Sequence, residues 1–496
     1  MVDSEQGTVL IIGGGLAGSE AAWQLAERGV TVRLLEMRPG QMTPAHHSDD
    51  LAELVCSNSL KSLALPSAAA TLKHELAAMG SFVLKMALEH SVAAGMALAV
   101  ERSAFAQAIT REIAAHPNIT LVREEVQSLV ALLDDPSIQQ IIVATGPLTS
   151  DALAGDLRQL IGSDYLAFFD AAAPILEAES LDMQKLVRQS RFDKGKGEYL
   201  NALLNKEQYL ALMDSLVKAN RVVLKDFEKR ELFSACMPVE EVARSGVDAL
   251  RYGALKPIGL ADPVSEQRPY AAIQLRAENN EETAWNLVGF QTNLTFSAQE
   301  QVFRGIPGLE QAHFLRFGVM HRNTFINAPA TLGKGFELPA HPTLRFAGQI
   351  TGTEGYTEAI ASGLFAALNT YASLAGGAPC VLPPTSTFGA LVAYATDEDT
   401  KHYQPLHVNY GLVPPLEQRI RGKRERYQAY SERAIAAVKD FVAENSELGF
   451  LAAYELPVIE QGDREQRGQR LGPSATLRSA QDDKGALCSA QDDRGL

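Results

Sequence analysis

Two isolated cysteines are the side chains best suited to covalent chemistry. Cys56 lies in the stretch AELVCSNSLKS and Cys236 in SACMPVEEVA. Neither has a partner at C-x-x-C spacing, so we predict no metal site and no redox dithiol. Pro238, Glu240 and Glu241 predict that a helix begins just after Cys236, and a helix N-terminus lowers the pKa of a nearby thiol. Taken alone, a lone cysteine is more often a small buried hydrophobe than a nucleophile, and composition does not decide between the two.

A glycine-rich turn near the start of the chain predicts a dinucleotide site. The apolar run TVLII leads into Gly13-x-Gly15-x-x-Gly18, a helical stretch follows, and the next strand ends at Glu36. Such glycines permit a tight turn, close approach of a pyrophosphate and close helix packing, while the helix N-terminus attracts phosphates. Glu36 would accept hydrogen bonds from ribose hydroxyls; the alternative is a purely structural turn. The predicted cofactor-binding residues of this unit are Gly13, Gly14, Gly15, Leu16, Ala17, Gly18 and Glu36.

A second glycine-rich turn late in the chain indicates which dinucleotide is bound. In LRFAGQITGTEGYTEAIASG a strand runs into a glycine turn and a long apolar helix. This pattern is typical of flavoproteins that close over FAD, and it would present Gly348, Gln349, Gly352 and Gly355 to the flavin. IVATGP (142–147) fits a mid-chain strand that passes near the cofactor. The alternative is a helix packed on a strand through small residues. We find no second GxGxxG motif, so NADH or NADPH would visit only transiently as reductant.

These elements predict an α/β fold: a Rossmann-type two-dinucleotide FAD-binding domain, glutathione-reductase-like, interrupted by a mixed α/β insertion domain. We expect residues 1–161 to form the first part of the FAD-binding domain and 162–314 the insertion on the substrate side. Residues 315–456 would complete the FAD-binding domain and add C-terminal helices, one of them predicted over PPLEQRIRGKRERYQAYSERAIAAVKDFVAEN. The remaining residues, 457–496, contain a SAQDD repeat and are expected to be disordered.

Composition restricts the partners and the compartment. The net charge of −15 argues against a protein that coats nucleic acid, but it does not exclude a local basic patch. Such a patch is the run QRIRGKRERY, whose Arg419, Arg421 and Lys423 would bind phosphates or, alternatively, form a solvated helix face paired with acids. Four cysteines in 496 residues indicate a reducing compartment. With neither a signal peptide nor a membrane span expected, we predict a cytoplasmic protein.

The motifs together resemble a known family. GGGLAGSEAAWQLAERGV, LVCSNSLKS, CMPVEEVA, LVGFQTNLTF, RFGVMHRNTFIN and FAGQITGTEGYTEAIASG are similar to blocks of the folate- and FAD-dependent tRNA (uracil-5-)-methyltransferases, which lie within the glucose-inhibited-division-protein-A-like flavoproteins. The resemblance runs from about Val9 to about Leu416. It implies methylation of a T-loop uridine in tRNA, with carbon from 5,10-methylenetetrahydrofolate and electrons from NADH or NADPH through FAD. It implies no obligate protein partner.

The resemblance also implies roles for single residues. Cys236 matches the nucleophile that adds to uracil C6, which makes C5 reactive. Cys56 matches a second cysteine beside the flavin, acting in proton transfer or in protection of the intermediate. In FGVMHRNTFIN, His321 is expected to stack on the folate pterin, and Arg322 to contact an anionic substrate; a structural role is the alternative for both. Three other functions stay open: a small-molecule NAD(P)H flavin oxidoreductase, a wobble-uridine tRNA modification protein with a GTPase partner, and a non-enzymatic flavin-bound RNA-binding protein.

Overall fold

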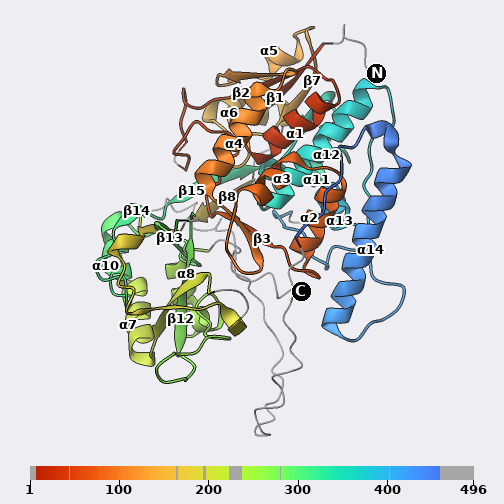
Figure 1. The fold of residues 1–496 in the computed structure, drawn as a ribbon. Helices are drawn as coiled ribbons and strands as arrows, with labels where there is room; N and C mark the ends of the chain where they lie inside the picture. Colours follow the sequence, from red (N-terminus) through yellow and green to blue (C-terminus); the bar gives the residue numbers. More distant parts are fainter. Residues whose placement is uncertain are drawn as a thin grey trace.

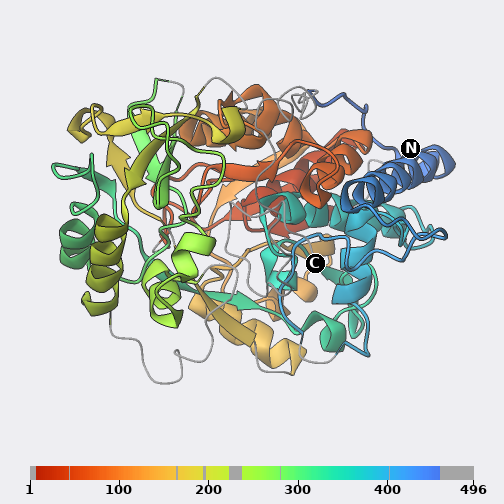
Figure 2. The same cartoon turned by 90° about the horizontal axis from the view of Figure 1, so that it is seen from below.

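The computed structural model describes residues 7–43, 45–162, 166–171, 173–193, 197–222, 237–279, 281–400 and 403–457, with the backbone alone at 166–171, 193 and 320–324. Two lobes lie side by side in both views (Figures 1 and 2). The larger lobe contains the first and last thirds of the chain, and the smaller lobe contains the middle. Each lobe has its own large hydrophobic core. We keep the division at 161/162 and 314/315 as a proposal.

The larger lobe is built on a six-stranded sheet with the order β16-β17-β7-β1-β2-β6. Every neighbouring pair is parallel except β16 with β17. Its strands are β1 (Thr8–Ile12), β2 (Val32–Glu36), β6 (Ile119–Arg123), β7 (Ile138–Val143), β16 (Glu337–Leu338) and β17 (His341–Phe346). The run from Val9 to Ile12 is apolar without alternation because helices or loops cover both faces of such a sheet. The predicted parallel α/β class is confirmed.

Helices from both ends of the chain cover this sheet. The helices of this lobe are α1 (Leu16–Glu27), α2 (Ala68–Ala78), α3 (Phe82–Glu89), α4 (Arg102–Ala115), α5 (Val130–Leu133), α6 (Asp151–Ile161), α11 (Ala328–Thr331), α12 (Tyr356–Leu374), α13 (Thr387–Ala395) and α14 (Lys423–Glu444), with short 3-10 turns η5 (Gln349–Thr351) and η6 (Ser446–Leu448). α1 and α12 pack closely because Gly363 has no side chain: a Cβ there would overlap the carbonyl of Ala17. A small sheet of β3 (Ser59–Ser62), β4 (Ser91–Val92) and β5 (Ala97–Val100) adjoins them.

The smaller lobe is an antiparallel sheet with the order β10-β11-β12-β13-β9-β14. Its strands are β9 (Ile175–Glu177), β10 (Leu186–Arg188), β11 (Tyr199–Leu204), β12 (Ala271–Ala277), β13 (Ala284–Leu287) and β14 (Phe314–Arg316). Its helices are α7 (Lys206–Lys218), α8 (Val239–Ser245), α9 (Ala249–Tyr252) and α10 (Phe296–Phe303), with 3-10 turns η1 (Ala178–Ser180) and η2 (Arg191–Asp193). An antiparallel ribbon of β8 (Leu166–Ala171) and β15 (Met320–Phe325) belongs to the two crossings between the lobes.

One helix begins later than the sequence pattern predicts. The pattern places a helix start at Pro414 and Pro415, whereas α14 begins at Lys423 after the N-cap Gly422. Glycine is about 1 kcal/mol less favourable than alanine inside a helix, so the chain uses Gly422 as the boundary. Arg419 and Arg421 therefore precede the helix, and the alternative prediction that they belong to a solvated helix face is wrong.

Candidate active site

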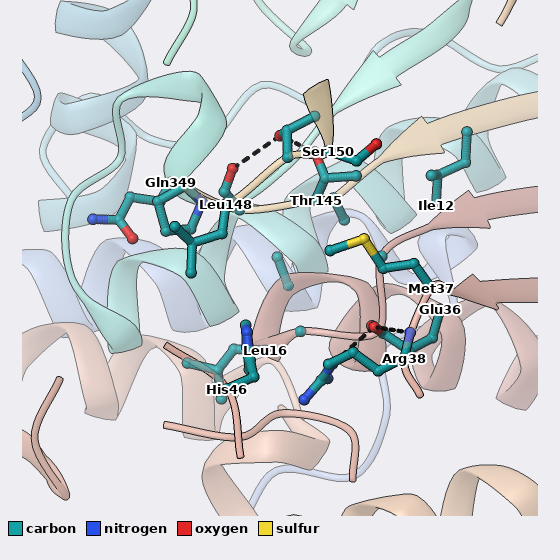
Figure 3. A pocket seen from close by; sticks show the side chains of 18 of the residues that line it. Ile12, Leu16, Glu36, Met37, Arg38, His46, Thr145, Leu148, Ser150 and Gln349 are labelled. Atoms are coloured by element: carbon teal, nitrogen blue, oxygen red, sulfur yellow. Dashed lines mark hydrogen bonds and ion pairs between the residues drawn. The ribbon is translucent and has the colours of Figure 1, made fainter. Parts of the chain in front are cut away.

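A cavity lies at the carboxyl ends of the parallel strands in the larger lobe, and it spans about 990 Å³ when the solvent space at its opening is included. Six segments line it: the turn after β1, the end of β2, the loop 46–55, the segment after β6, the loop after β7, and the turn after β17 with the start of α12. Figure 3 shows Glu36 and Arg38 on one side of this cavity and Gln349 on the other. Ligands of open parallel sheets bind at this edge, where strand order reverses. Two glycine turns more than 300 positions apart in the sequence thus share one cavity.

The first glycine turn leaves room for a phosphate at one residue only. A Cβ on Gly13, whose φ is +102°, would lie 2.6 Å from the Ala144 carbonyl oxygen, and a Cβ on Gly18 would overlap the Gly13 carbonyl. At Gly15, the N-cap of α1, no atom lies within 4 Å of the Cβ position, although the residue lines the cavity. Gly13 and Gly18 therefore serve the packing of the turn. Gly15 leaves a cradle at the helix N-terminus of the kind that receives a pyrophosphate.

Glu36 is held as an ionised acceptor at the end of β2. Its Oε2 accepts from the Gly14 N–H at 2.8 Å, and its Oε1 accepts from Arg38 Nε at 2.9 Å. Burial raises the pKa of the Glu36 carboxyl, but the hydrogen bonds and charge of Arg38 outweigh it, so this pKa lies below its usual value. Arg38 also pairs with Glu53 at 3.2 Å. The free lone pairs of Glu36 suit the hydroxyl groups of a ribose.

The second glycine turn closes the opposite side. Gly348 (φ +83°) donates its N–H to Ser362 Oγ at 2.6 Å, and Gly348, Gln349 and Gly355 line the cavity. Gly352, which the sequence pattern also predicts to face the flavin, does not line this cavity; it packs against Tyr403, whose hydroxyl a Cβ there would overlap. The cradle at Gly15, the anionic Glu36 and this second turn together fit the phosphate, ribose and ring ends of FAD.

The Cys56 loop forms part of the same site. Val55 lines the cavity, and the N–H groups of Cys56 and Ser57 donate to the hydroxyl oxygen of Tyr356 at 2.8 and 3.2 Å. Tyr356, which follows Gly355, is itself on the cavity wall. Burial, and then the negative charge available to Cys56, raise the pKa of the Tyr356 hydroxyl, so it remains protonated. Cys56 is not in a disulfide, and it lies one residue from the cavity lining.

Comparison with known proteins identifies the family. A family model described as "Glucose inhibited division protein A" matches residues 8–378. The methylenetetrahydrofolate–tRNA-(uracil-5-)-methyltransferase TrmFO of Heliobacterium modesticaldum is 50% identical over 438 residues, which cover 88% of this chain and 98% of that protein. The protein of the same name from Pelotomaculum thermopropionicum is 50% identical over 434 residues, which also cover 88% of this chain and 98% of that protein. This chain belongs to the methylenetetrahydrofolate–tRNA-(uracil-5-)-methyltransferase family. The resemblance drawn from the motifs is thereby confirmed.

The fold of this family member also matches a solved structure. Aquifex aeolicus GidA superposes with a TM-score of 0.63 at 16% identity, covering 90% of this chain and 74% of that one. At that identity the match speaks for the fold alone. It confirms the predicted fold class, a flavoprotein-type domain with an insertion.

The remaining predicted site residues of this family member lie in three places. Cys236 falls outside the described residues. Four residues after it, at the start of α8, the buried Glu240 carboxylate accepts a hydrogen bond from the Asn293 N–H at 2.7 Å, which anchors α8 to the rest of the smaller lobe. His321 and Arg322 lie on β15, whose backbone runs beside η5 of the second glycine turn. Arg419, Arg421 and Lys423 are exposed near the start of α14 and do not line the cavity. Residues 458–496, where disorder is predicted, are also outside the described part.

Some lining residues escape sequence reasoning. Met37, Arg38, His46 and Glu53 follow the second strand, and the segments 124–126 and 145–150 follow β6 and β7. The position of Arg38 could have been inferred from the sequence, because it follows the predicted ribose-binding acid Glu36 by two residues and pairs with it. His46 and Glu53 lie in an irregular loop, where no helix or strand periodicity indicates which side chains face the cavity. Among the described residues no cluster fit to hold a metal ion is found, and no helix there is long and apolar enough to cross a bilayer.

Proposed function

We propose that this chain forms 5-methyluridine in the T-loop of tRNA, with 5,10-methylenetetrahydrofolate as carbon donor and NADH or NADPH as reductant. The observation that carries the proposal is the position of the Cys56 loop on the wall of a cavity that fits FAD, in a chain 50% identical to enzymes named for this reaction. FAD, held by the cradle at Gly15, by Glu36 and by the turn at Gly348, would supply the electrons that convert the one-carbon unit to a methyl group.

The chain's own contribution to the chemistry is thiol catalysis. The Cys236 thiolate adds to uracil C6, and the ring electrons shift to C5, which forms a bond to the one-carbon unit of the folate. Loss of the C5 proton and breakage of the carbon–nitrogen bond to the folate release tetrahydrofolate and leave a methylene group on C5. Reduced FAD, when bound, would supply the hydride that makes this group a methyl, and departure of the Cys236 thiolate restores the ring. Cys56 assists as a proton carrier or by protecting the intermediate. Tyr356 fixes the backbone of Cys56 and so sets where its sulfur can act.

The substrate must be extruded from its loop to reach such a site, which costs a few kcal/mol. We assign part of the compensating phosphate contacts to Arg419, Arg421 and Lys423. They are exposed, and within the described part of the chain none of them makes an ion pair with Glu417 or Glu425. The carboxylate of Glu425 instead turns back over Gly422 at the helix start. His321 is assigned to the folate pterin and Arg322 to an anionic group of the substrate.

The test is a reconstituted reaction. Unmodified tRNA is incubated with the FAD-loaded protein, 5,10-methylenetetrahydrofolate and NADPH, and 5-methyluridine is mapped by mass spectrometry of nuclease fragments. We expect one modified uridine, in the T-loop, and none in a tRNA that carries cytidine there. Cys236→Ala should abolish methyl transfer and keep FAD bound, whereas Cys488→Ala is the matched control. NADPH oxidation without tRNA methylation would contradict the proposal.

A further inference from the structure

A second, larger cleft lies between the two lobes, and Glu53, three residues before Cys56, lines both this cleft and the flavin cavity. It encloses about 1760 Å³ including its open mouth. The larger lobe contributes the loop around His47 and the start of α4, and the smaller lobe contributes β14 and the start of α10. The family comparison and the flavin site assign no role to it.

One wall of this cleft carries a column of aromatic rings. Phe296 stacks on Phe317 with ring centres 4.6 Å apart and planes inclined by 18°, and Phe317 stacks on Phe314 at 5.0 Å and 7°. Phe314 is buried in the core of the smaller lobe, whereas Phe296 is 55% exposed. All three rings line the cleft. The column therefore runs from the core to an open ring, on which one further flat ring would fit.

Polar atoms without partners accompany this column. Arg102 pairs with Oε2 of Glu278 at 3.0 Å, and Glu278 is only 7% exposed. The other carboxylate oxygen, Oε1, is buried and has no hydrogen-bond partner, and the same holds for Nε of Arg316. A buried polar atom without a partner costs about 1–3 kcal/mol, so such atoms are normally satisfied by a ligand or water. Glu278 and Arg316 both line the cleft, so a carboxylate and a guanidinium with unused hydrogen-bonding capacity lie in the same lining as the stacking surface.

We propose that this cleft binds an unstacked nucleobase of the tRNA, a second base beside the methylated one. A nucleobase has a flat face for Phe296 and an edge that carries both acceptors and donors, which suits a lining in which Arg316 and Glu278 each have an unsatisfied polar atom. Proteins that read RNA loops commonly stack splayed bases on aromatic side chains and bond their edges. This inference rests on the proposed function for the identity of the RNA.

The charges of the cleft favour a base from RNA over the adenine of a dinucleotide. Its lining holds four acids (Asp50, Glu53, Glu101 and Glu278) against two arginines and no lysine. Phosphates would be repelled from such a lining. A base extruded from RNA enters alone and leaves its phosphate at the mouth, whereas a dinucleotide has to bring its pyrophosphate close to its adenine.

The two arginines also connect the cleft with the thiol. Arg102 donates to the Leu54 carbonyl, and Arg316 donates to the Val55 carbonyl at 2.7 Å. Both arginines of the cleft are thus hydrogen-bonded to the backbone of the two residues that precede Cys56. A nucleotide near the target in the same strand would therefore be within reach of the cleft while the target base faces the flavin cavity.

The test uses Phe296→Ala in the FAD-loaded protein. We expect the Kd for tRNA, measured by filter binding, to rise about tenfold, within the range for loss of one base–aromatic stack. Phe296→Trp keeps a stacking face and should restore binding. Tyr252→Ala removes an aromatic ring that is also more than half exposed (64%), from the same lobe but outside the cleft, and should leave binding unchanged.

A second measurement separates the sources of the base. Reduction of the bound flavin by NADPH without tRNA should have the same KM in Phe296→Ala and in the wild type. A raised KM with unchanged tRNA affinity would assign the cleft to the dinucleotide and overturn the proposal, and so would no change in either quantity. If the wild type binds tRNA but forms no 5-methyluridine, the proposed function fails while the cleft remains testable, because binding needs no turnover.

Discussion

The hydroxyl oxygen of Tyr356 accepts the backbone N–H of Cys56 at 2.8 Å and thereby joins residues 300 positions apart. Tyr356 opens α12 directly after the second glycine turn and lines the flavin cavity, so this contact ties the thiol-bearing loop to the wall of that cavity. The same oxygen accepts the Ser57 N–H. One phenol group therefore determines the position of two residues of the loop.

Tyr356→Phe should uncouple this loop while keeping the ring in the cavity wall. Two N–H groups lose their acceptor, so we expect the free energy of unfolding to fall by about 1–3 kcal/mol. The rate of methyl transfer should fall on the order of 100-fold, the size of effect that a misplacement of about 1 Å has. FAD content per protein and the rate are measured together. Tyr371→Phe, on the same helix and without a hydroxyl hydrogen bond to the described residues, is the control; equal rates for both variants would refute the positioning role.

Alanine substitutions at two glycines of the first turn should have different effects, one on FAD binding and the other on stability. Gly15→Ala places a methyl group in open space inside the cavity, at a backbone φ of −73° that alanine tolerates. We expect a folded protein with an unchanged thermal midpoint that has lost FAD, seen as the loss of its absorption near 450 nm. Gly18→Ala drives a Cβ into the Gly13 carbonyl and should lower the thermal midpoint itself. If Gly15→Ala retained stoichiometric FAD, the cradle would not be the pyrophosphate site.

The elements around the flavin cavity were predictable because each has a local signal. The strand at Thr8–Ile12 is found at the predicted residues, and the helix predicted after the first glycine turn is α1 (Leu16–Glu27). The convergence of two glycine turns also followed, because parallel strands bring their carboxyl ends to one edge. At α14 the sequence pattern gave the wrong start, because the helix begins after Gly422 although the charged residues before it also fit a helix.

The cleft between the lobes could not be predicted in the same way. Phe296, Phe314 and Phe317 stand in a helix, a strand and a loop, and only the packing of the smaller lobe brings their rings into one column. Arg102 meets Glu278 across 176 positions. Side-chain pairs of this kind depend on the relative placement of two lobes, which a single sequence does not encode in any short pattern.

The exposed basic segment predicts a salt-dependent effect on RNA binding. Replacing Arg419, Arg421 and Lys423 together by alanine should weaken tRNA binding and reduce the slope of log K against log salt by about one for each phosphate contact that is lost. Lys218→Ala, at a cation that is 73% exposed and paired with Asp214 in the smaller lobe, is the control. An unchanged slope in the triple variant would remove this segment from the RNA interface.

A buried carboxyl group predicts how stability depends on pH. Glu75 on α2 is 1% exposed and accepts from the N–H groups of Thr387 (2.6 Å) and Phe388 (3.2 Å) at the start of α13. Burial raises its pKa to about 7, above the value of about 4.5 in the unfolded chain. The folded state therefore binds more protons than the unfolded state between pH 4.5 and 7. The contribution of Glu75 to stability is thus full below pH 4.5 and falls as the pH rises towards 7.

The size of this decline follows from the shift in pKa. A shift of this order corresponds to about 3 kcal/mol of unfolding free energy, which should be lost progressively across that range and remain lost above it. Glu75→Gln keeps an acceptor for one N–H and removes the titration, so its unfolding free energy should fall less between pH 5 and 7.5 than that of the wild type in urea titrations. Glu89→Gln, at an exposed residue that ends α3, should follow the wild type. An identical pH profile for Glu75→Gln and wild type would show that Glu75 is already ionised in the folded protein at pH 5.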